Sequence, residues 1–174
     1  KFSIMNLEEL KARQAPIKAQ YQQDPASALR TLAARGRLTP NDQTVRIETG
    51  HGKVLAGLHP ATGGTGEDAC SGDMLLEALA ACSGVTLKAV ATAMGIEIRD
   101  GTVTAEGDLN FRGTLGVSKE APVGFTDIRL KFVLDTDASD DQLITLLRLA
   151  ERYCVIYQTL RQPPQLAVER LRQA

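Results

Sequence analysis

The chain has 174 residues, a hydrophobic fraction of 43% and a formal net charge of −1 at pH 7. This length is sufficient for one domain with a proper core, and the near-neutral charge indicates neither nucleic acid nor an acidic membrane surface as a partner. The charge is unevenly spread, because residues 1–40 carry seven Lys and Arg residues against three Asp and Glu residues. We interpret this basic segment as a solvated surface, with contact to an acidic partner as the alternative.

No secretory signal or membrane-spanning segment is expected. The N-terminus lacks a basic start followed by a long apolar stretch. The apolar run 72–95 is interrupted by Asp73, Glu77 and Lys88, and its longest uncharged stretch is the ten residues 78–87. Because a span needs about 20 residues, the run predicts a buried helix. Three cysteines in a chain without a signal predict reduced thiols and a cytoplasmic protein.

The N-terminal part of the chain is expected to be a helical arm over residues 1–39. Residues 6–23 have the pattern of a polar amphipathic helix, with a kink or break expected at Pro16. Asp24-Pro25 is a good helix start, with Asp24 as the N-cap. We expect the sequence ALRTLAAR (28–35) to form the helix that follows and Gly36 to end it. A second domain then spans residues 40–174.

The middle of the chain predicts a strand pair followed by one long helix. Residues 44–50 and 53–59 are typical of two strands that form a hairpin around His51-Gly52. The glycine-rich loop 60–72 lacks the ending of a phosphate-binding loop and the spacing of a dinucleotide fingerprint. The helix expected at 72–95 is apolar on nearly every face, which indicates that other elements cover it on all sides.

Two long strands and a second helical region complete the predicted elements. Residues 102–113 and 125–137 alternate as strands do. A helix capped at Ser139 is expected to run, with a possible break, through Cys154 to about residue 160. Pro163-Pro164 ends it, and LAVERL (166–171) is a candidate final strand.

Cys82 and Cys154 are the residues most able to carry chemistry. They stand 72 positions apart, so only the fold can bring them together. Metal binding is disfavoured, because the chain has no CxxC pair and both histidines, His51 and His59, fall on the expected hairpin. No signature of a catalytic Cys–His pair surrounds Cys82. Two interpretations stay open from the residues alone: redox-active thiols, or small buried hydrophobic side chains.

Two motifs, in this order and spacing, resemble those of the OsmC/Ohr family, named for osmotically induced and organic hydroperoxide resistance proteins. They are ACSGDMLLEALAAC (69–82) and AERYCVIYQTL (150–160), and the resemblance covers residues 40–172. It implies an α+β fold in which antiparallel sheets wrap around central apolar helices in an intertwined homodimer. A dimer of this kind would explain the all-round apolarity of residues 72–95.

The resemblance also implies a thiol peroxidase that acts on organic hydroperoxides. Cys82 matches the peroxidatic cysteine, which becomes a sulfenic acid, and Cys154 matches the resolving cysteine, which converts that acid into a disulfide. No bound cofactor is implied, since an external dithiol, either a protein or a small molecule, would restore both thiols. The expected partners are therefore the hydroperoxide, the dithiol and a second copy of the chain, without nucleic acid or membrane.

The chain departs from the family pattern at the groups that polarise the reactive thiol, an arginine and a glutamate. Asp73 falls near the glutamate position, nine residues before Cys82, and is our third candidate catalytic residue. On an ideal helix this spacing places the two side chains about 180° apart, so Asp73 serves only if the first turn is irregular. The arginine is not assigned, with Arg37 and Arg46 both candidates.

Two further departures concern the flanks of the motifs. Val155 replaces the usual proline after the second cysteine, which predicts a weaker helix break there. Cys70 stands where serine or asparagine is common, as a bystander or an alternative resolving thiol. Because the arginine is not assigned, the alternative function is a redox-sensing or apolar-ligand-binding protein on the same fold, without peroxidase turnover.

Overall fold

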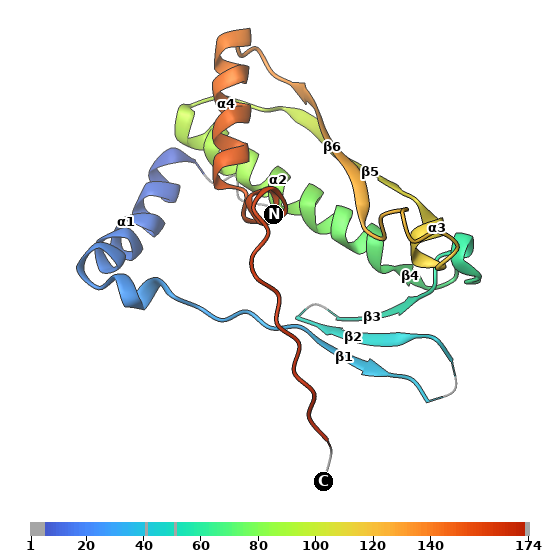
Figure 1. Ribbon diagram of the computed structural model, residues 1–174. Helices are drawn as coiled ribbons and strands as arrows, with labels where there is room; N and C mark the ends of the chain where they lie inside the picture. Colours follow the sequence, from blue (N-terminus) through green and yellow to red (C-terminus); the bar gives the residue numbers. More distant parts are fainter. Residues whose placement is uncertain (1–5, 41, 51, 173–174) are drawn as a thin grey trace.

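One long helix, α2, organises the fold, with a strand hairpin on one side and two further helices on another (Figure 1). The computed structural model describes residues 6–40, 42–50 and 52–172. The helices are α1 (Leu7–Gln23), α2 (Ser71–Met94), α3 (Phe111–Thr114), α4 (Asp140–Tyr153) and α5 (Val155–Arg161), with short 3₁₀ turns at Pro25–Ala28 and Pro60–Thr62. The strands are β1 (Arg35–Leu38), β2 (Val45–Thr49), β3 (Gly52–Gly57), β4 (Ala69–Cys70), β5 (Asp100–Leu109) and β6 (Phe125–Asp135).

Helix α2 confirms the helix expected at 72–95 and runs without interruption for 24 residues. Its sequence is dominated by Leu and Ala, which are strong helix formers. Gly95 ends it in the left-handed conformation, with φ of 69°, a geometry that glycine adopts without steric cost. The helix is therefore a straight scaffold on which the position of each side chain follows from its place in the sequence.

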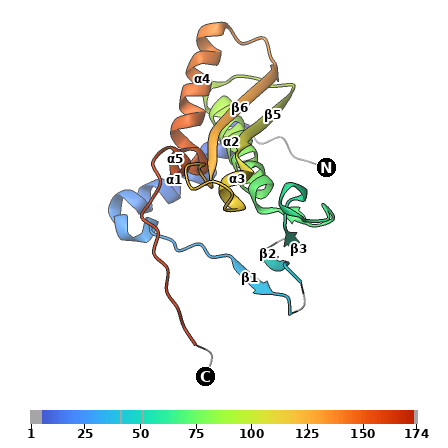
Figure 2. The same cartoon turned by 45° about the vertical axis from the view of Figure 1, so that its right-hand side comes forward.

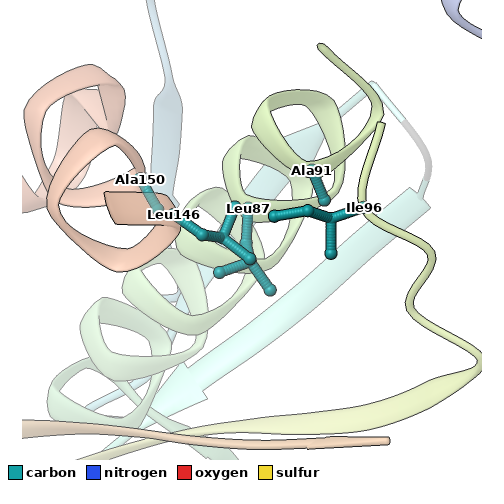
Figure 3. Packing of buried hydrophobic residues seen from close by; sticks show 5 residues of the cluster. All are labelled: Leu87, Ala91, Ile96, Leu146 and Ala150. Atoms are coloured by element: carbon teal, nitrogen blue, oxygen red, sulfur yellow. The ribbon is translucent and has the colours of Figure 1, made fainter. Parts of the chain in front are cut away.

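The core lies where α2 packs against α4. The buried residues of α2 recur every four positions, and those of α4 do the same, so each helix presents one buried stripe to the other. Figure 3 shows the centre of this contact, where Ile96 from the segment after α2 belongs to the same buried cluster. The stripes consist of Leu79, Ser83, Leu87 and Ala91 on α2, and of Leu146 and Ala150 on α4.

The long antiparallel hairpin β5–β6 confirms the two strands expected at 102–113 and 125–137. It packs along α2 on the side that α4 leaves free. Ile128, Leu130, Phe132 and Leu134 are half-buried, whereas Lys131 and Val133 between them are exposed, as alternation predicts. The hairpin therefore covers a second face of α2.

The second sheet has the order β1-β2-β3-β4 and lies beside the N-terminal end of α2 (Figure 2). Strands β2 and β3 confirm the predicted hairpin, although His51 lies outside the described residues. Two sequence predictions near the ends of the chain are wrong. Residues 29–34 form no regular element and β1 lies inside the range expected to be helical, while residues 162–172 extend away from the helices without forming a strand.

Gly36 explains why β1 forms where a helix end was expected. A Cβ at this position would lie 2.8 Å from a methyl group of Val45 and 3.2 Å from one of Ile47 on the neighbouring strand. Glycine therefore permits the close approach of β1 to β2. Helix α1, by contrast, is confirmed and continues past Pro16.

Much of the apolar surface is uncovered in the single chain. Only four residues of α2 are buried, and Val85 on its outer face is 73% exposed. By length and composition alone α2 could also cross a membrane, but a core helix of a globular protein meets the same test. Because α2 packs against α4, α5 and β5, we interpret it as a core helix with one face open.

Candidate active site

The fold brings Cys82 and Cys154 together within one chain. Cys82 lies halfway along α2, beside the buried stripe, and is half-buried. Cys154 comes four residues after Ala150, so it extends the row of buried α4 residues that faces α2. It is 1% exposed. Its side chain is close enough to Cys82 to be one of the groups that lower the pKa of the Cys82 thiol, and both thiols are free. The pair therefore has one accessible and one enclosed sulfur.

Cys154 is itself the break between α4 and α5. Its backbone is extended, with φ of −75° and ψ of 111°, and its sulfur accepts a hydrogen bond from the N–H of Tyr157 at 3.4 Å, as an N-cap side chain does. In the last turn of α4, the backbone oxygen of Glu151 accepts a hydrogen bond from Nε2 of Gln158 at 2.8 Å. The break is thus complete although Val155 stands in place of proline.

This break supplies the polarising groups for Cys82. Burial raises the pKa of the Cys82 thiol, but hydrogen bonds from the N–H of Ile156, the Cys154 side chain, the N–H of Val155 and the Thr86 side chain together lower it by more. The net pKa is below that of an ordinary thiol. The N–H groups of a first helical turn have no intrahelical acceptor and carry partial positive charge, so they favour a thiolate.

The sequence analysis did not find these groups. The polarising groups expected from the sequence were an arginine and a carboxylate, whereas Cys82 lies against the N-terminus of α5. Thr86 follows Cys82 by four positions, and this spacing on one helical face was the available signal. Ser83 was also missed; its Oγ lies 3.3 Å from the Cys154 sulfur.

Neither candidate arginine contacts Cys82 in the described residues. Arg37 forms an ion pair with Glu48 across β1 and β2, with Nε 3.1 Å from Oε1. Arg46 lies on β2 in the same sheet. The groups of the described chain that shift the pKa of Cys82 are hydrogen-bond partners and burial, without a charged side chain.

Asp73 is not brought to Cys82 within one chain. Helix α2 is regular from Ser71 onward, so nine residues separate the two side chains by about 13.5 Å along the axis and by about half a turn. Asp73 is exposed and lines a cavity of about 320 Å³ together with Cys70 and His59. A role for Asp73 at the thiol stays a prediction, and it requires a second chain.

A larger cleft of about 530 Å³ lies between β6 and the helices α2, α4 and α5, and its lining includes neighbours of the two cysteines but neither cysteine itself. Leu79, one helical turn before Cys82, and Tyr157, whose N–H binds the Cys154 sulfur, both line it. Seven of its twelve lining residues are apolar, and the others include the charged side chains of Asp127, Glu151 and Arg161. The apolar lining residues are Leu79, Phe125, Ile128, Leu130, Phe132, Leu147 and Leu160.

The described residues hold no cluster of three or more His, Cys, Asp or Glu side chains suited to a metal ion. The reactive groups that the described residues bring together at this site are two thiols. One is activated by a helix N-terminus and the other is packed behind it.

The fold is that of OsmC-like proteins. An OsmC-like protein from Mycoplasma pneumoniae has a TM-score of 0.65 at 16% identity, covering 77% of this chain and 89% of that chain. An organic hydroperoxide resistance protein from Elizabethkingia anophelis has a TM-score of 0.62 at 16% identity, covering 78% and 91%. The organic hydroperoxide resistance protein OhrB of Bacillus subtilis has a TM-score of 0.52 at 23% identity, covering 78% and 94%.

The family is established by sequence. The profile of OsmC-like proteins matches residues 64–169, which include both cysteine motifs and most of the chain. The protein therefore belongs to the OsmC/Ohr family, as its motifs indicated. No curated protein sequence matches it significantly.

Proposed function

We propose that this protein is a cysteine-dependent peroxidase that reduces organic hydroperoxides, with Cys82 as the peroxidatic and Cys154 as the resolving cysteine. The observation that carries the proposal is the position of Cys82 against both the N-terminus of α5 and the Cys154 side chain. This arrangement combines a lowered pKa, partial access and a second thiol within reach, which are the requirements of a two-cysteine cycle.

The cycle has three steps. The Cys82 thiolate attacks one oxygen of the O–O bond, that bond breaks, and the departing alkoxide takes up a proton to leave as an alcohol. Cys154 then attacks the sulfur of the Cys82 sulfenic acid, so that an S–S bond forms, the S–O bond breaks and water leaves. An external dithiol, a protein or a small molecule, finally reduces the disulfide by thiol–disulfide exchange.

The apolar cleft supports a hydroperoxide with a hydrocarbon part as the substrate. A hydrocarbon group placed between β6 and α2 would lie against Leu79, which stands one helical turn before Cys82. Hydrogen peroxide has no group that would gain from this contact. We therefore expect an alkyl or aryl hydroperoxide to react faster than hydrogen peroxide.

The direct test measures consumption of cumene hydroperoxide in the presence of a small dithiol. The wild-type protein is expected to turn over, and Cys82→Ser to abolish consumption. Cys154→Ser should give a sulfenic acid at Cys82 that is not converted into an intramolecular disulfide. A wild-type protein that consumes no organic hydroperoxide under these conditions would contradict the proposal.

The second candidate is a redox-sensing or apolar-ligand-binding protein on the same fold. The observation that favours it is that hydrogen bonds lower the pKa of Cys82 in the described chain, without any cationic side chain. A sensor would form the Cys82–Cys154 disulfide once and be reduced slowly. A burst of one equivalent of peroxide consumed, without further turnover at any dithiol concentration, would favour this candidate.

We further propose a homodimer as the working form in the cytoplasm. The open face of α2 supports it, because an uncovered apolar helix face is costly in water. A second chain could also bring Asp73 and an arginine to the thiols. Val85→Arg should convert a dimer to a monomer, measured by light scattering, whereas the equally exposed Val117→Arg in the loop before β6 should not. A wild-type monomer would contradict this proposal.

A further inference from the structure

Ser83 occupies an unusual position for a hydroxyl group. It is 1% exposed and stands in the buried stripe of α2, where Leu79, Leu87 and Ala91 are the other members. A buried hydroxyl without a partner is costly, so its hydrogen bond is informative. That bond joins Ser83 Oγ to the sulfur of Cys154 at 3.3 Å.

By distance alone either group could donate this hydrogen bond, and the surrounding contacts favour the hydroxyl as the donor. The Cys154 sulfur already accepts from the N–H of Tyr157, and the Cys154 side chain lowers the pKa of Cys82, as a thiol does when its S–H donates to a neighbouring thiolate. Once the single S–H of Cys154 is directed to Cys82, the remaining hydrogen between Cys154 and Ser83 is that of the hydroxyl. The Ser83 O–H therefore donates to the Cys154 sulfur.

We propose that Ser83 is a positioning residue for the resolving step: its hydroxyl holds the Cys154 sulfur beside Cys82 in the orientation that attack requires. The inference rests on the proposed function for its physiological meaning, since the resolving step is the second step of that cycle. The hydrogen bond of Ser83 is to the resolving thiol, so its loss should slow the attack by Cys154 more than the reaction of Cys82 with peroxide.

The chemistry of the step is balanced. Cys154 loses its thiol proton, which leaves with the hydroxyl of the sulfenic acid as water, while its sulfur forms the S–S bond and the S–O bond of Cys82 breaks. The electron pair that forms the new bond comes from the Cys154 sulfur. A hydroxyl that is hydrogen-bonded to this sulfur restricts it to the stripe that faces α2.

The test compares Ser83→Ala with Ser71→Ala, both in a Cys70→Ser background that removes the third thiol. Alanine fits the buried site and favours the helix, so folding should be retained, as checked by circular dichroism. Ser71 is an exposed residue of the same helix and receives the same chemical change. In single-turnover reactions with cumene hydroperoxide, Ser83→Ala should slow disulfide formation by about tenfold and sulfenic acid formation by clearly less.

A second measurement does not depend on peroxide. An aromatic disulfide that releases a coloured thiolate first forms a mixed disulfide with Cys82; Cys154 then displaces a second thiolate, and this later phase reports Cys154 attack alone. Ser83→Ala should slow the later phase by about tenfold and the first phase by clearly less. If no variant reacts with peroxide, the proposed function fails and this measurement still decides the role of Ser83.

Two outcomes would overturn the inference. One is a later phase in Ser83→Ala that is as fast as in Ser71→Ala. The other is an equal slowing of both phases, because a merely structural role of Ser83 would disturb both thiols together.

Discussion

A disulfide between Cys82 and Cys154 should stabilise the folded chain by about 2 to 4 kcal/mol over the reduced protein. The two cysteines are 72 positions apart, and closing a loop of that length removes about 15 cal/mol/K of entropy from the unfolded chain, or roughly 4 kcal/mol. Oxidation also removes the thiolate that the N-terminus of α5 stabilises, and this loss offsets about 1 to 2 kcal/mol. The loop term is larger, so the sign is stabilising.

The assay is urea unfolding followed by circular dichroism on two samples of the Cys70→Ser protein at one concentration. One sample is reduced, and the other is oxidised with diamide and shown by mass spectrometry to have lost two hydrogen atoms per chain. A shared concentration matters because association changes apparent stability. The account requires that the two sulfurs lie close enough to form a disulfide without distorting the fold. Equal stability of the two samples, or a less stable oxidised sample, would refute it.

Three further predictions follow from the site and the core. Val155→Pro removes one N–H that donates to Cys82, and proline suits this position because it is the first of a helix that follows an extended residue. The variant should therefore raise the pKa of Cys82 and lower its alkylation rate at neutral pH about fivefold. Val155→Ala keeps the N–H and should change neither. In the wild-type protein, the alkylation rate of Cys82 should reach half its maximum at a lower pH than that of an ordinary thiol, since a lowered pKa keeps the thiolate as pH falls. Leu146→Ala should lower the free energy of unfolding, measured in urea, by about 3 kcal/mol because Leu146 is 0% exposed. Ile144→Ala on the same helix should lower it by less than about 1 kcal/mol because Ile144 is 65% exposed. Similar losses for the two variants would contradict the described α2–α4 contact.

The elements that build the site were predictable because local sequence determines them. The length and composition of 72–95 predicted α2, and the capping box at Ser139 and Gln142 marks the start of α4. The two cysteine motifs predicted that Cys82 and Cys154 meet. Each of these signals lies within one helix or one motif.

The predictions that failed depended on contacts between distant segments. Residues 28–35 consist largely of good helix formers, but Gly36 allows β1 to pair closely with β2, and pairing overrides propensity. The tail 166–171 alternates as a strand does, yet it finds no neighbouring strand in the described chain. Local propensity is a weak guide where pairing with a distant strand decides the conformation.

The activation of Cys82 was not predictable for the same reason. The N–H groups of Val155 and Ile156 belong to the backbone, so the identity of the side chains does not indicate their role. Their role depends on the break at Cys154 and on the packing of α5 against α2. Sequence reasoning looked for an arginine and a carboxylate, whereas the fold supplies a helix N-terminus.

The central claim is that Cys82 and Cys154 act as a pair in peroxide reduction. Its most direct test is peptide mapping by mass spectrometry after the reduced wild-type protein has reacted with one equivalent of cumene hydroperoxide. The account predicts one Cys82–Cys154 disulfide within each chain, with Cys70 left as a free thiol. A protein whose thiols remain reduced, or whose new disulfide includes Cys70 or joins two chains, would contradict it.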